Sequence, residues 1–302
     1  MSSQTEEGTV AEARIAVIGG TNLYEIEGLT EVDEVSIETP FAPPSDRITV
    51  GNLEGVPVAF LPRHGKGHRI MPSELPARAN IYALKSLGVE FIVSVSAVGS
   101  LSDDVHPMDL VVPDQLIDRT RMRPSTFFGE GIVAHVGFAE PFCPVLSQLL
   151  VQTAREVGAR VHPQGTYLVM EGPMFSTKAE SFLYRGWGAH VIGMTALPEA
   201  KLAREAEICY ATLACVTDYD CWHETSEVVT IDMVVQNLQR NADTAKRIVR
   251  QVVSRMPDHR FCPCASALEN SIITAPELIP PEVKERLRPI IDKYVRCEDY
   301  AQ

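Results

Sequence analysis

The sequence lacks the features that would place it in the membrane, secreted or targeted classes of protein. None of its apolar runs approaches the roughly 20 residues that a membrane span needs. Its first residues, MSSQTEEGTVAEAR, have neither the positive flank nor the apolar segment of a targeting peptide. Seven cysteines, an odd number confined to residues 143–297, do not form the pattern of a secreted disulfide framework. We therefore expect a cytoplasmic protein with mostly buried, reduced thiols.

Basic residues are also scarce. Lysine and arginine number 27 against 40 aspartates and glutamates, which gives the 302-residue chain a net charge of −13. Nucleic acids and anionic membranes both bind clustered positive charge, so neither is expected as a partner. Hydrophobic residues make up 45% and charged residues 22%, an ordinary globular balance that excludes disorder over most of the chain.

Apolar runs alternate with helical patterns along most of the chain. The runs at 13–20, 56–65 and 91–100 end in glycine or small residues, as strands buried on both faces do. Between the last two, apolar residues recur at helical spacing over 77–87, with Ser73 as a candidate cap. This order predicts an α/β fold with a mainly parallel or mixed sheet covered by helices.

The chain divides into three parts by pattern. We expect residues 1–11 to be a disordered lead and residues 12–256 to form one domain, since no repeat or low-complexity linker interrupts them. Residues 257–302 look like a C-terminal extension, packed on the domain or on a neighbouring subunit. Its last helical pattern contains Pro289, where a bend is expected.

Glycines and basic residues follow two predicted strands and suggest an anion site. After the first strand, paired glycines can expose backbone N–H groups and Thr21 can add a hydroxyl, although a plain tight turn is equally compatible. After the second comes the densest positive cluster, Arg63-His64-Gly-Lys66-Gly-His68-Arg69. Guanidinium and imidazolium groups at a strand end suit phosphate. The alternative is a solvated basic loop.

Polar and aromatic residues follow further strands. Ser96 ends the apolar run FIVSV, and Glu171 and Phe175 follow the strand TYLVM. Met194 and Thr195 follow HVIG. These suit contacts to an anion, a sugar and a planar base, whereas a buried small-residue turn and a core phenylalanine are the structural alternatives.

Two carboxylates end the strand ATLACVTD. Asp218 and Asp220 are two residues apart, so in an extended chain both side chains face one ligand. Two carboxylates that close disfavour joint ionisation, so one can keep a proton at neutral pH and act as a general acid. A metal-binding DxD pair and a turn capped by two aspartates are the alternatives.

A Cys-x-Cys pair, Cys262 and Cys264, lies in the extension. Its spacing permits a local disulfide or one edge of a metal site. In a reducing cytoplasm, two free thiols are the favoured interpretation, and no metal is expected.

Taken together, nine segments follow one another in a recognisable order: GGTNL, RHGKGHR, PSELPARANIYALKSLG, SAVGSL, DQLIDRTRMRPSTFF, AEPFCP, EGPMFSTKAES, GMTALPEAKLAREAEICYA and TDYDCW. In this order they resemble the trimeric purine nucleoside phosphorylase family over residues 14–250, and within it the branch that acts on 5′-methylthioadenosine. The resemblance implies a central mixed sheet flanked by helices, and a homotrimer or a dimer of trimers. It implies phosphorolysis to adenine and 5-methylthioribose 1-phosphate, in purine and methionine salvage, with phosphate as co-substrate and no cofactor.

The resemblance also assigns roles to residues. Asp218, with Asp220 beside it, would assist the purine as it leaves, since cleavage builds negative charge on the base and positive charge on the ribose. Phosphate would be held by Thr21, Arg63, His64, Ser96, Ala97 and Thr195. The nucleoside would contact Phe175, Met194, an apolar 5′ pocket with Ile231 and Val234, and His135 of a neighbouring subunit.

Three departures from the family pattern keep other activities open. They are Asn22, Met174 and Gly193, and they leave a 5′-methylthioinosine or inosine/guanosine phosphorylase as the alternative. A hydrolytic nucleosidase is disfavoured because water needs no anion clamp, and the same residues argue against a non-catalytic nucleoside sensor.

Overall fold

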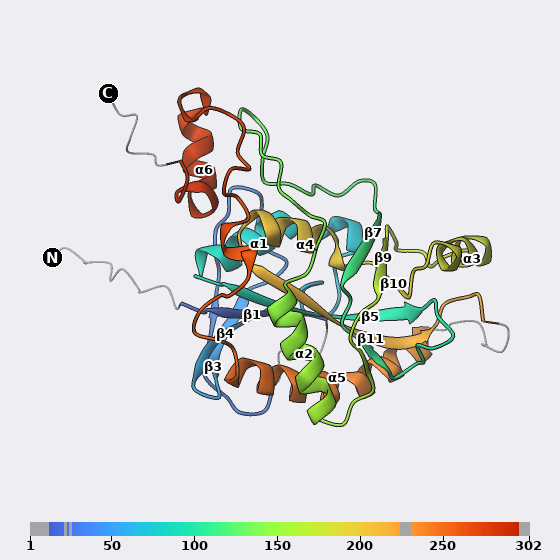
Figure 1. The fold of residues 1–302 in the computed structure, drawn as a ribbon. Helices are drawn as coiled ribbons and strands as arrows, with labels where there is room; N and C mark the ends of the chain where they lie inside the picture. The colour runs from blue at the N-terminus through green and yellow to red at the C-terminus, as the bar shows by residue number, and fades with distance from the viewer. Residues whose placement is uncertain (1–11, 21–22, 24–25, 224–230, 296–302) are drawn as a thin grey trace.

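The computed structural model describes residues 12–20, 23, 26–223 and 231–295. They form a mixed β-sheet of 11 strands with helices on both faces (Figure 1). Side chains at 231–235 and 238 are outside this description. The main path of the sheet follows the order β2 (Leu29–Val35), β3 (Ile48–Leu53), β4 (Val56–Pro62), β1 (Ile15–Gly19), β5 (Phe91–Ser100), β10 (Val191–Gly193), β9 (Thr166–Met170) and β7 (Gln115–Arg119).

The long strand β11 (Cys209–Tyr219) pairs with β5 along its whole length, off the main path. It also pairs with the short β6 (Leu110–Val111), which in turn pairs with β8 (Val161–His162). Strands β1, β4, β5 and β11 run parallel, whereas β10 runs antiparallel to β5. The sheet is therefore mixed, and the predicted α/β fold is confirmed.

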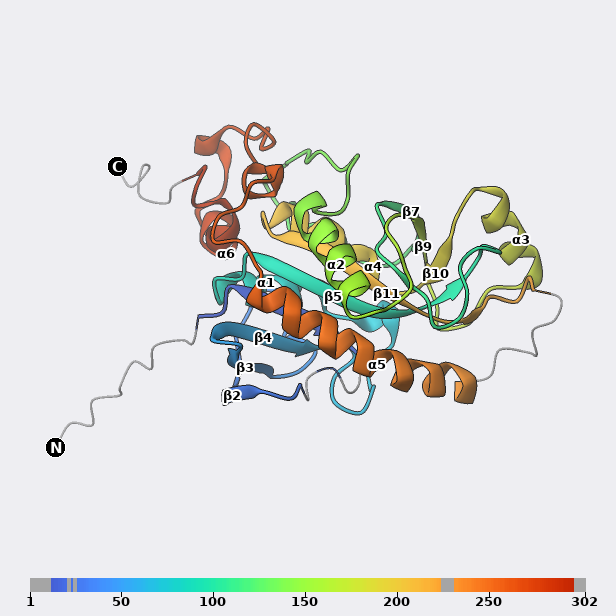
Figure 2. The same ribbon diagram turned by 60° about the horizontal axis from the view of Figure 1, so that its bottom comes forward.

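Two hydrophobic cores lie on opposite faces of the sheet. One is covered by α2 (Pro144–Glu156) and α5 (Ile231–Ser254), which lie together on the near face in Figure 2. The other is covered by α1 (Ala77–Ser86) and α4 (Ala196–Glu205). Because side chains alternate along a strand, β11 serves both cores, with Tyr210 on one side and Leu213 on the other.

The predicted cap of α1 is wrong. Ser73 lies in a short 3-10 turn, Pro72–Glu74, and donates a hydrogen bond to the carbonyl oxygen of Glu171 at 3.2 Å. The helix instead begins at Ala77, after Pro76. Sequence patterns also missed the largely exposed strand β2 and helix α3 (Lys178–Gly186), whose few buried residues leave little apolar periodicity.

The C-terminal segment packs on the same chain. Helix α6 (Pro281–Ile291), which includes Pro289, lies beside α1 (Figure 1). Val283 and Leu287 of this helix are buried and join the core on the α1 face. The boundaries drawn from the sequence at 1–11, 12–256 and 257–302 stay a prediction. Among the described residues, no helix combines the length and apolar character needed to cross a membrane.

Candidate active site

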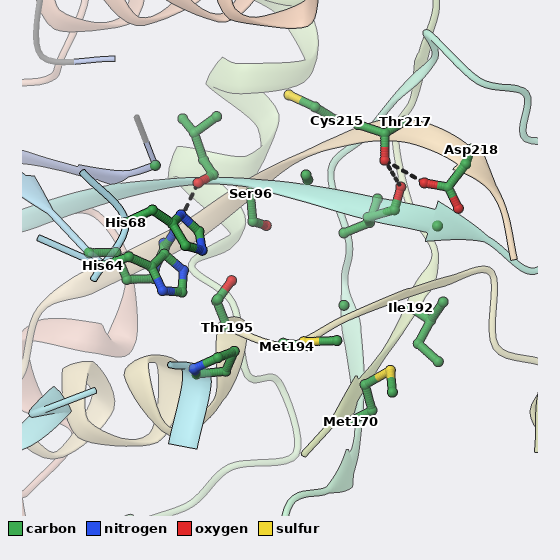
Figure 3. Close-up of a pocket in the computed structure, with 18 of the residues that line it drawn as sticks. His64, His68, Ser96, Met170, Ile192, Met194, Thr195, Cys215, Thr217 and Asp218 are labelled. Atoms are coloured by element: carbon green, nitrogen blue, oxygen red, sulfur yellow. Dashed lines mark hydrogen bonds between the residues drawn. The ribbon is translucent and has the colours of Figure 1, made fainter. Parts of the chain in front are cut away.

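A cavity of about 350 Å³ opens near the carboxyl ends of several strands. Nine of the residues predicted from the sequence line it: Arg63, His64, Ser96, Ala97, Phe175, Met194, Thr195, Asp218 and Asp220. Figure 3 shows the histidines at one end, Ser96 and Thr195 beside them, and Asp218 at the far end. The size is that of a pocket for a small ligand.

The other four predicted residues are not seen in this cavity. His135 is exposed, and its backbone N–H donates to the carbonyl of Ser271 at 2.9 Å. Thr21 lies outside the described residues, as do the side chains of Ile231 and Val234, which belong to α5. Their predicted roles stay predictions.

Arg63, directly after β4, is buried in an ion pair. Its Nε donates to Glu199 Oε1 at 2.5 Å and its Nη2 to Glu199 Oε2 at 3.1 Å. Nη1 donates to the carbonyl of Val95 at 3.0 Å, and Nη2 also donates to Ser94 Oγ at 2.7 Å. Of the five guanidinium N–H groups, one on Nη1 has no partner among the described residues. Arg63 can therefore offer an anion one fixed N–H.

Glu199 is the partner that sequence reasoning missed. It is 2% exposed, lies on α4, and also accepts a hydrogen bond from the hydroxyl of Tyr210 at 3.0 Å. A buried guanidinium needs a buried counter-charge. The apolar pattern around 196–205 gave no sign that one glutamate points inward.

Three buried hydroxyls lie close together near this end of the cavity. The side-chain oxygens of Ser96, Thr195 and Tyr167 make no well-formed hydrogen bond within the part of the chain that is described, although Ser96 and Thr195 lie close enough to the Tyr167 hydroxyl to act on its pKa, lowering it against the rise that burial causes. A Cβ on Gly193 would stand 2.2 Å from the Tyr167 hydroxyl, so the glycine at this position makes room for that ring. Because buried hydroxyls are normally paired, these groups form a ready set of donors for an oxyanion.

His64 contributes a neutral imidazole. Its Nδ1 lies 2.9 Å from the carbonyl oxygen of Ile70, which can only accept, so the proton sits on Nδ1. Burial, together with the adjacent Arg63 cation, lowers the pKa of His64 to about 4. The imidazolium expected from the basic cluster is therefore wrong for this ring, because burial and the neighbouring cation keep it neutral. Nε2 is thus left as an acceptor.

The basic cluster divides in two. His68 stacks on His64 with ring centroids 4.2 Å apart, and both line the cavity. Lys66 instead pairs with Glu34, and Arg69 lies 3.5 Å from Asp46. The dense positive charge that the sequence suggested is therefore largely neutralised outside the cavity.

Arg123 fixes the turn that carries Met194 and Thr195. Its Nη1 donates to the carbonyls of Met194 at 2.5 Å and Leu197 at 2.7 Å, and its Nη2 to the carbonyl of Glu171 at 2.5 Å. Three carbonyls on two segments are thus tied to one side chain. No local pattern around Arg123 indicates this role.

Asp218 occupies the opposite end of the cavity, at a bulge in β11. The pairing with β5 shifts between Val216 and Asp218. The Thr217 hydroxyl lies 2.6 Å from Asp218 Oδ2 and 3.3 Å from the carbonyl oxygen of Val98 (Figure 3). Burial raises the pKa of Asp218 to about 6, and the Asp220 carboxylate raises it as well. A protonated Asp218 can therefore persist close to neutral pH.

Asp220 lies beside Asp218 and also lines the cavity. Burial raises the pKa of Asp220, whereas the nearby Ser181 and Ser176 hydroxyls and the backbone N–H of Cys221 lower it, and its buried Oδ2 makes no well-formed hydrogen bond among the residues described. The DxD metal alternative finds no support, because the one group of three or more potential metal ligands in the described chain lies elsewhere.

The walls between the two ends are apolar. Met170, Ile192 and Met194 line one side in Figure 3. Phe175 is 54% exposed, so it is a cavity-lining residue rather than a core phenylalanine. Met174, one of the departures from the family pattern, is 81% exposed. From one end to the other, the cavity thus offers hydroxyl hydrogen-bond donors, an apolar middle and two carboxyl groups.

Comparisons with known proteins point to one group of enzymes. Residues 14–254 match the family model described as the Phosphorylase superfamily. The chain is 56% identical over 290 residues to the S-methyl-5′-thioadenosine phosphorylase of Gloeobacter violaceus, covering 94% of this chain and 96% of that one. It resembles the crystal structure of a methylthioadenosine phosphorylase from an antarctic soil metagenomic library, with a TM-score of 0.88, 50% identity, and coverage of 93% and 99%. A variant adenosine/methylthioadenosine phosphorylase from Schistosoma mansoni, in complex with methylthioadenosine, matches with a TM-score of 0.76, 36% identity, and coverage of 83% and 94%.

Proposed function

The chain belongs to the Phosphorylase superfamily, and we propose that it cleaves 5′-methylthioadenosine with phosphate, giving adenine and 5-methylthioribose 1-phosphate. The observation that carries this proposal is the cavity itself, which sets unpartnered oxygen donors at one end against a carboxyl group with a raised pKa at the other. The names of the relatives support the same reaction.

Phosphate binds at the end formed by Arg63, His64, Ser96 and Thr195. The free N–H of Arg63 and the two hydroxyls donate to phosphate oxygens, and a neutral His64 accepts the one P–OH of hydrogen phosphate through Nε2. Thr21 and Ala97 complete this end. The phosphate is the nucleophile, so the reaction needs no further cofactor.

Asp218 acts as the acid on the departing base. When protonated, its O–H donates toward purine N7, where negative charge develops as the glycosidic bond breaks. The Thr217 hydroxyl can donate its hydrogen bond either to the Val98 carbonyl oxygen or to Asp218 Oδ2, so it can adjust to either protonation state of Asp218. Phosphate, on the opposite side of the ribose, meets the positive charge that grows at C1′.

Asp220 favours a 6-aminopurine. Its unpartnered Oδ2 can accept from the exocyclic amino group of adenine. The 6-oxo group of hypoxanthine would place a second acceptor against this carboxylate, which is unfavourable in a buried site. Met194 would contact the ribose and Phe175 the purine.

We further propose a cytoplasmic homotrimer in which His135 and the apolar residues Ile231 and Val234 complete the 5′ end of the site. The exposed Val133 and Ile273, near His135, supply apolar surface for a neighbouring subunit. A methylthio group then meets an apolar environment rather than a polar one.

The reaction is tested by measuring base release from 5′-methylthioadenosine, 5′-methylthioinosine, adenosine and inosine, each with and without phosphate. We expect adenine from 5′-methylthioadenosine to be released fastest and only with phosphate. Release independent of phosphate would make the enzyme a hydrolase. Preferential release of hypoxanthine would move the assignment to the 6-oxopurine branch.

A further inference from the structure

Four cysteines meet at a point far from the cavity. The sulfurs of Cys143, Cys209, Cys262 and Cys264 all lie within 4.8 Å of one another. They come from three separate segments: the residue before α2, the first residue of β11, and the Cys-x-Cys pair of the C-terminal segment. The chain has only seven cysteines in all, so four at one point is a strong concentration. Sequence spacing identified the pair, but not its two partners.

The sulfur separations fit one metal ion better than disulfides. The sulfurs of Cys209 and Cys262 are 3.3 Å apart, whereas a disulfide requires about 2.05 Å. A tetrahedral ion with metal–sulfur bonds of about 2.3 Å holds its sulfurs about 3.8 Å from one another. All the described cysteines are unbonded thiols. The cluster therefore has the span of a single tetrahedral ion.

We propose that these four cysteines bind a structural zinc ion. Four thiolates in a tetrahedral set suit zinc among the common divalent cations, and a complete set of protein ligands leaves no position for water or substrate. Cys143 lies at the N-terminus of the 13-residue helix α2, whose dipole favours a thiolate. Three of the four are buried within the α2 and α5 core, so ionised sulfurs there require a cation.

The site would fasten the C-terminal segment to the domain. Cys262 and Cys264 begin the stretch that continues to α6, while Cys143 directly precedes the covering helix α2 and Cys209 begins strand β11. Cys209 and Asp218 stand at opposite ends of β11, roughly 30 Å apart along the strand. The zinc is thus structural, and phosphorolysis does not pass through it.

The first test is the metal content of the full-length protein, purified under reducing conditions without chelator. Elemental analysis is expected to give one zinc per chain, released when a mercurial reagent titrates the four thiols. Cobalt reconstitution is expected to give the absorption bands of a tetrahedral thiolate site. Zinc-free protein with four reactive thiols, or with an intact mass showing disulfides instead, would overturn the proposal.

Cysteine variants distinguish binding of zinc by the four thiols from a role of these cysteines in core packing alone. Cys264→Ser is expected to lose the zinc, whereas Cys215→Ser, an equally buried cysteine outside the cluster, keeps it. Cys262 is only partly buried, so Cys262→His can fold and should retain zinc as a three-cysteine, one-histidine site. If Cys264→Ser and Cys215→Ser carry the same zinc, the proposal fails.

Removing zinc with a strong chelator should lower the melting temperature by about 5 °C or more, and adding zinc should restore it. The rate of adenine release at 25 °C should change less than about twofold, since the cluster is remote from the cavity. An unchanged melting temperature after complete zinc removal would contradict a structural role. The zinc content and the melting temperature do not depend on which nucleoside the enzyme cleaves, so these two measurements test the zinc site separately from the proposed reaction.

Discussion

At the scale of single residues, Asp218 carries the chemistry. In Asp218→Asn the amide cannot deliver a proton to N7, so kcat/KM for 5′-methylthioadenosine should fall by about 10²- to 10⁴-fold. Asp243→Asn, on the exposed side of α5, makes the same chemical change away from the cavity and should leave the rate unaltered. Steady-state kinetics of both variants provide the comparison, and equal rates for Asp218→Asn and wild type would contradict the assigned role.

The raised pKa of Asp218 also predicts a pH dependence. The acid form is needed for catalysis, so kcat/KM for 5′-methylthioadenosine, measured at saturating phosphate, should decline as the pH rises above about 6. In Asp218→Asn this decline should disappear. A wild-type profile that keeps rising to pH 9 would be inconsistent with an acid at this position.

The same carboxyl group is expected to limit stability. The pKa of Asp218 in the folded protein is about 6 and exceeds the ordinary value of 3.8. The protonated group therefore contributes its full share to the free energy of unfolding below about pH 3.8, and this share is lost as the pH rises through 6. At pH 8 the ionised group costs about 3 kcal/mol. Asp218→Asn should therefore raise the free energy of unfolding at pH 8, by up to this amount, and by less at pH 5. Urea unfolding at the two pH values measures the difference, and an equal gain at both would refute the explanation.

Breaking the ion pair of Arg63 and Glu199 is expected to lower both the stability of the protein and its affinity for phosphate. Glu199→Gln leaves the buried guanidinium without its counter-charge, which should lower the free energy of unfolding by about 3–5 kcal/mol. Because Arg63 then loses its fixed orientation, KM for phosphate should rise more than KM for the nucleoside. Denaturant unfolding and two-substrate kinetics measure these effects. A stable variant with an unchanged KM for phosphate would contradict them.

At the scale of elements, the positions of strand ends were predictable. Apolar runs that stop at small or polar residues predicted β1, β4, β5 and β11, and parallel strands bring such ends together. Nine predicted residues consequently line one cavity. The supports behind them were not predictable, because Glu199 and Arg123 act across more than 70 residues of chain. No local pattern encodes such a long-range hydrogen bond.

Gly99 on β5 pairs opposite Asp218, directly after the bulge in β11. A Cβ on Gly99 would lie 3.2 Å from Asp218 Oδ1 and 3.3 Å from Ile192 Cγ2, so Gly99→Ala should displace the carboxyl group. We expect kcat to fall by about tenfold or more, with a smaller change in KM. Gly186→Ala, at a helical glycine with open space around it, is the matched control and should retain full activity. Equal kcat for the two variants would exclude this steric role.

At the scale of the whole molecule, we expect three chains to act together. Light scattering should give a mass three times the 33.2 kDa of one chain, or twice that for paired trimers. His135→Ala should lower kcat/KM for 5′-methylthioadenosine by up to about tenfold and leave KM for phosphate unchanged. A fully active monomer would rule out a shared site. The sequence alone cannot supply this geometry, since the partner surface is not encoded in any one segment.

One cavity is expected to hold phosphate and the purine on opposite sides of the ribose whose glycosidic bond is cleaved. The most direct measurement follows adenine release and phosphate consumption together, in one reaction with 5′-methylthioadenosine. We expect one phosphate consumed and one 5-methylthioribose 1-phosphate formed for each adenine, with no release when phosphate is omitted. Adenine release at an undiminished rate without phosphate, giving free 5-methylthioribose, would contradict it.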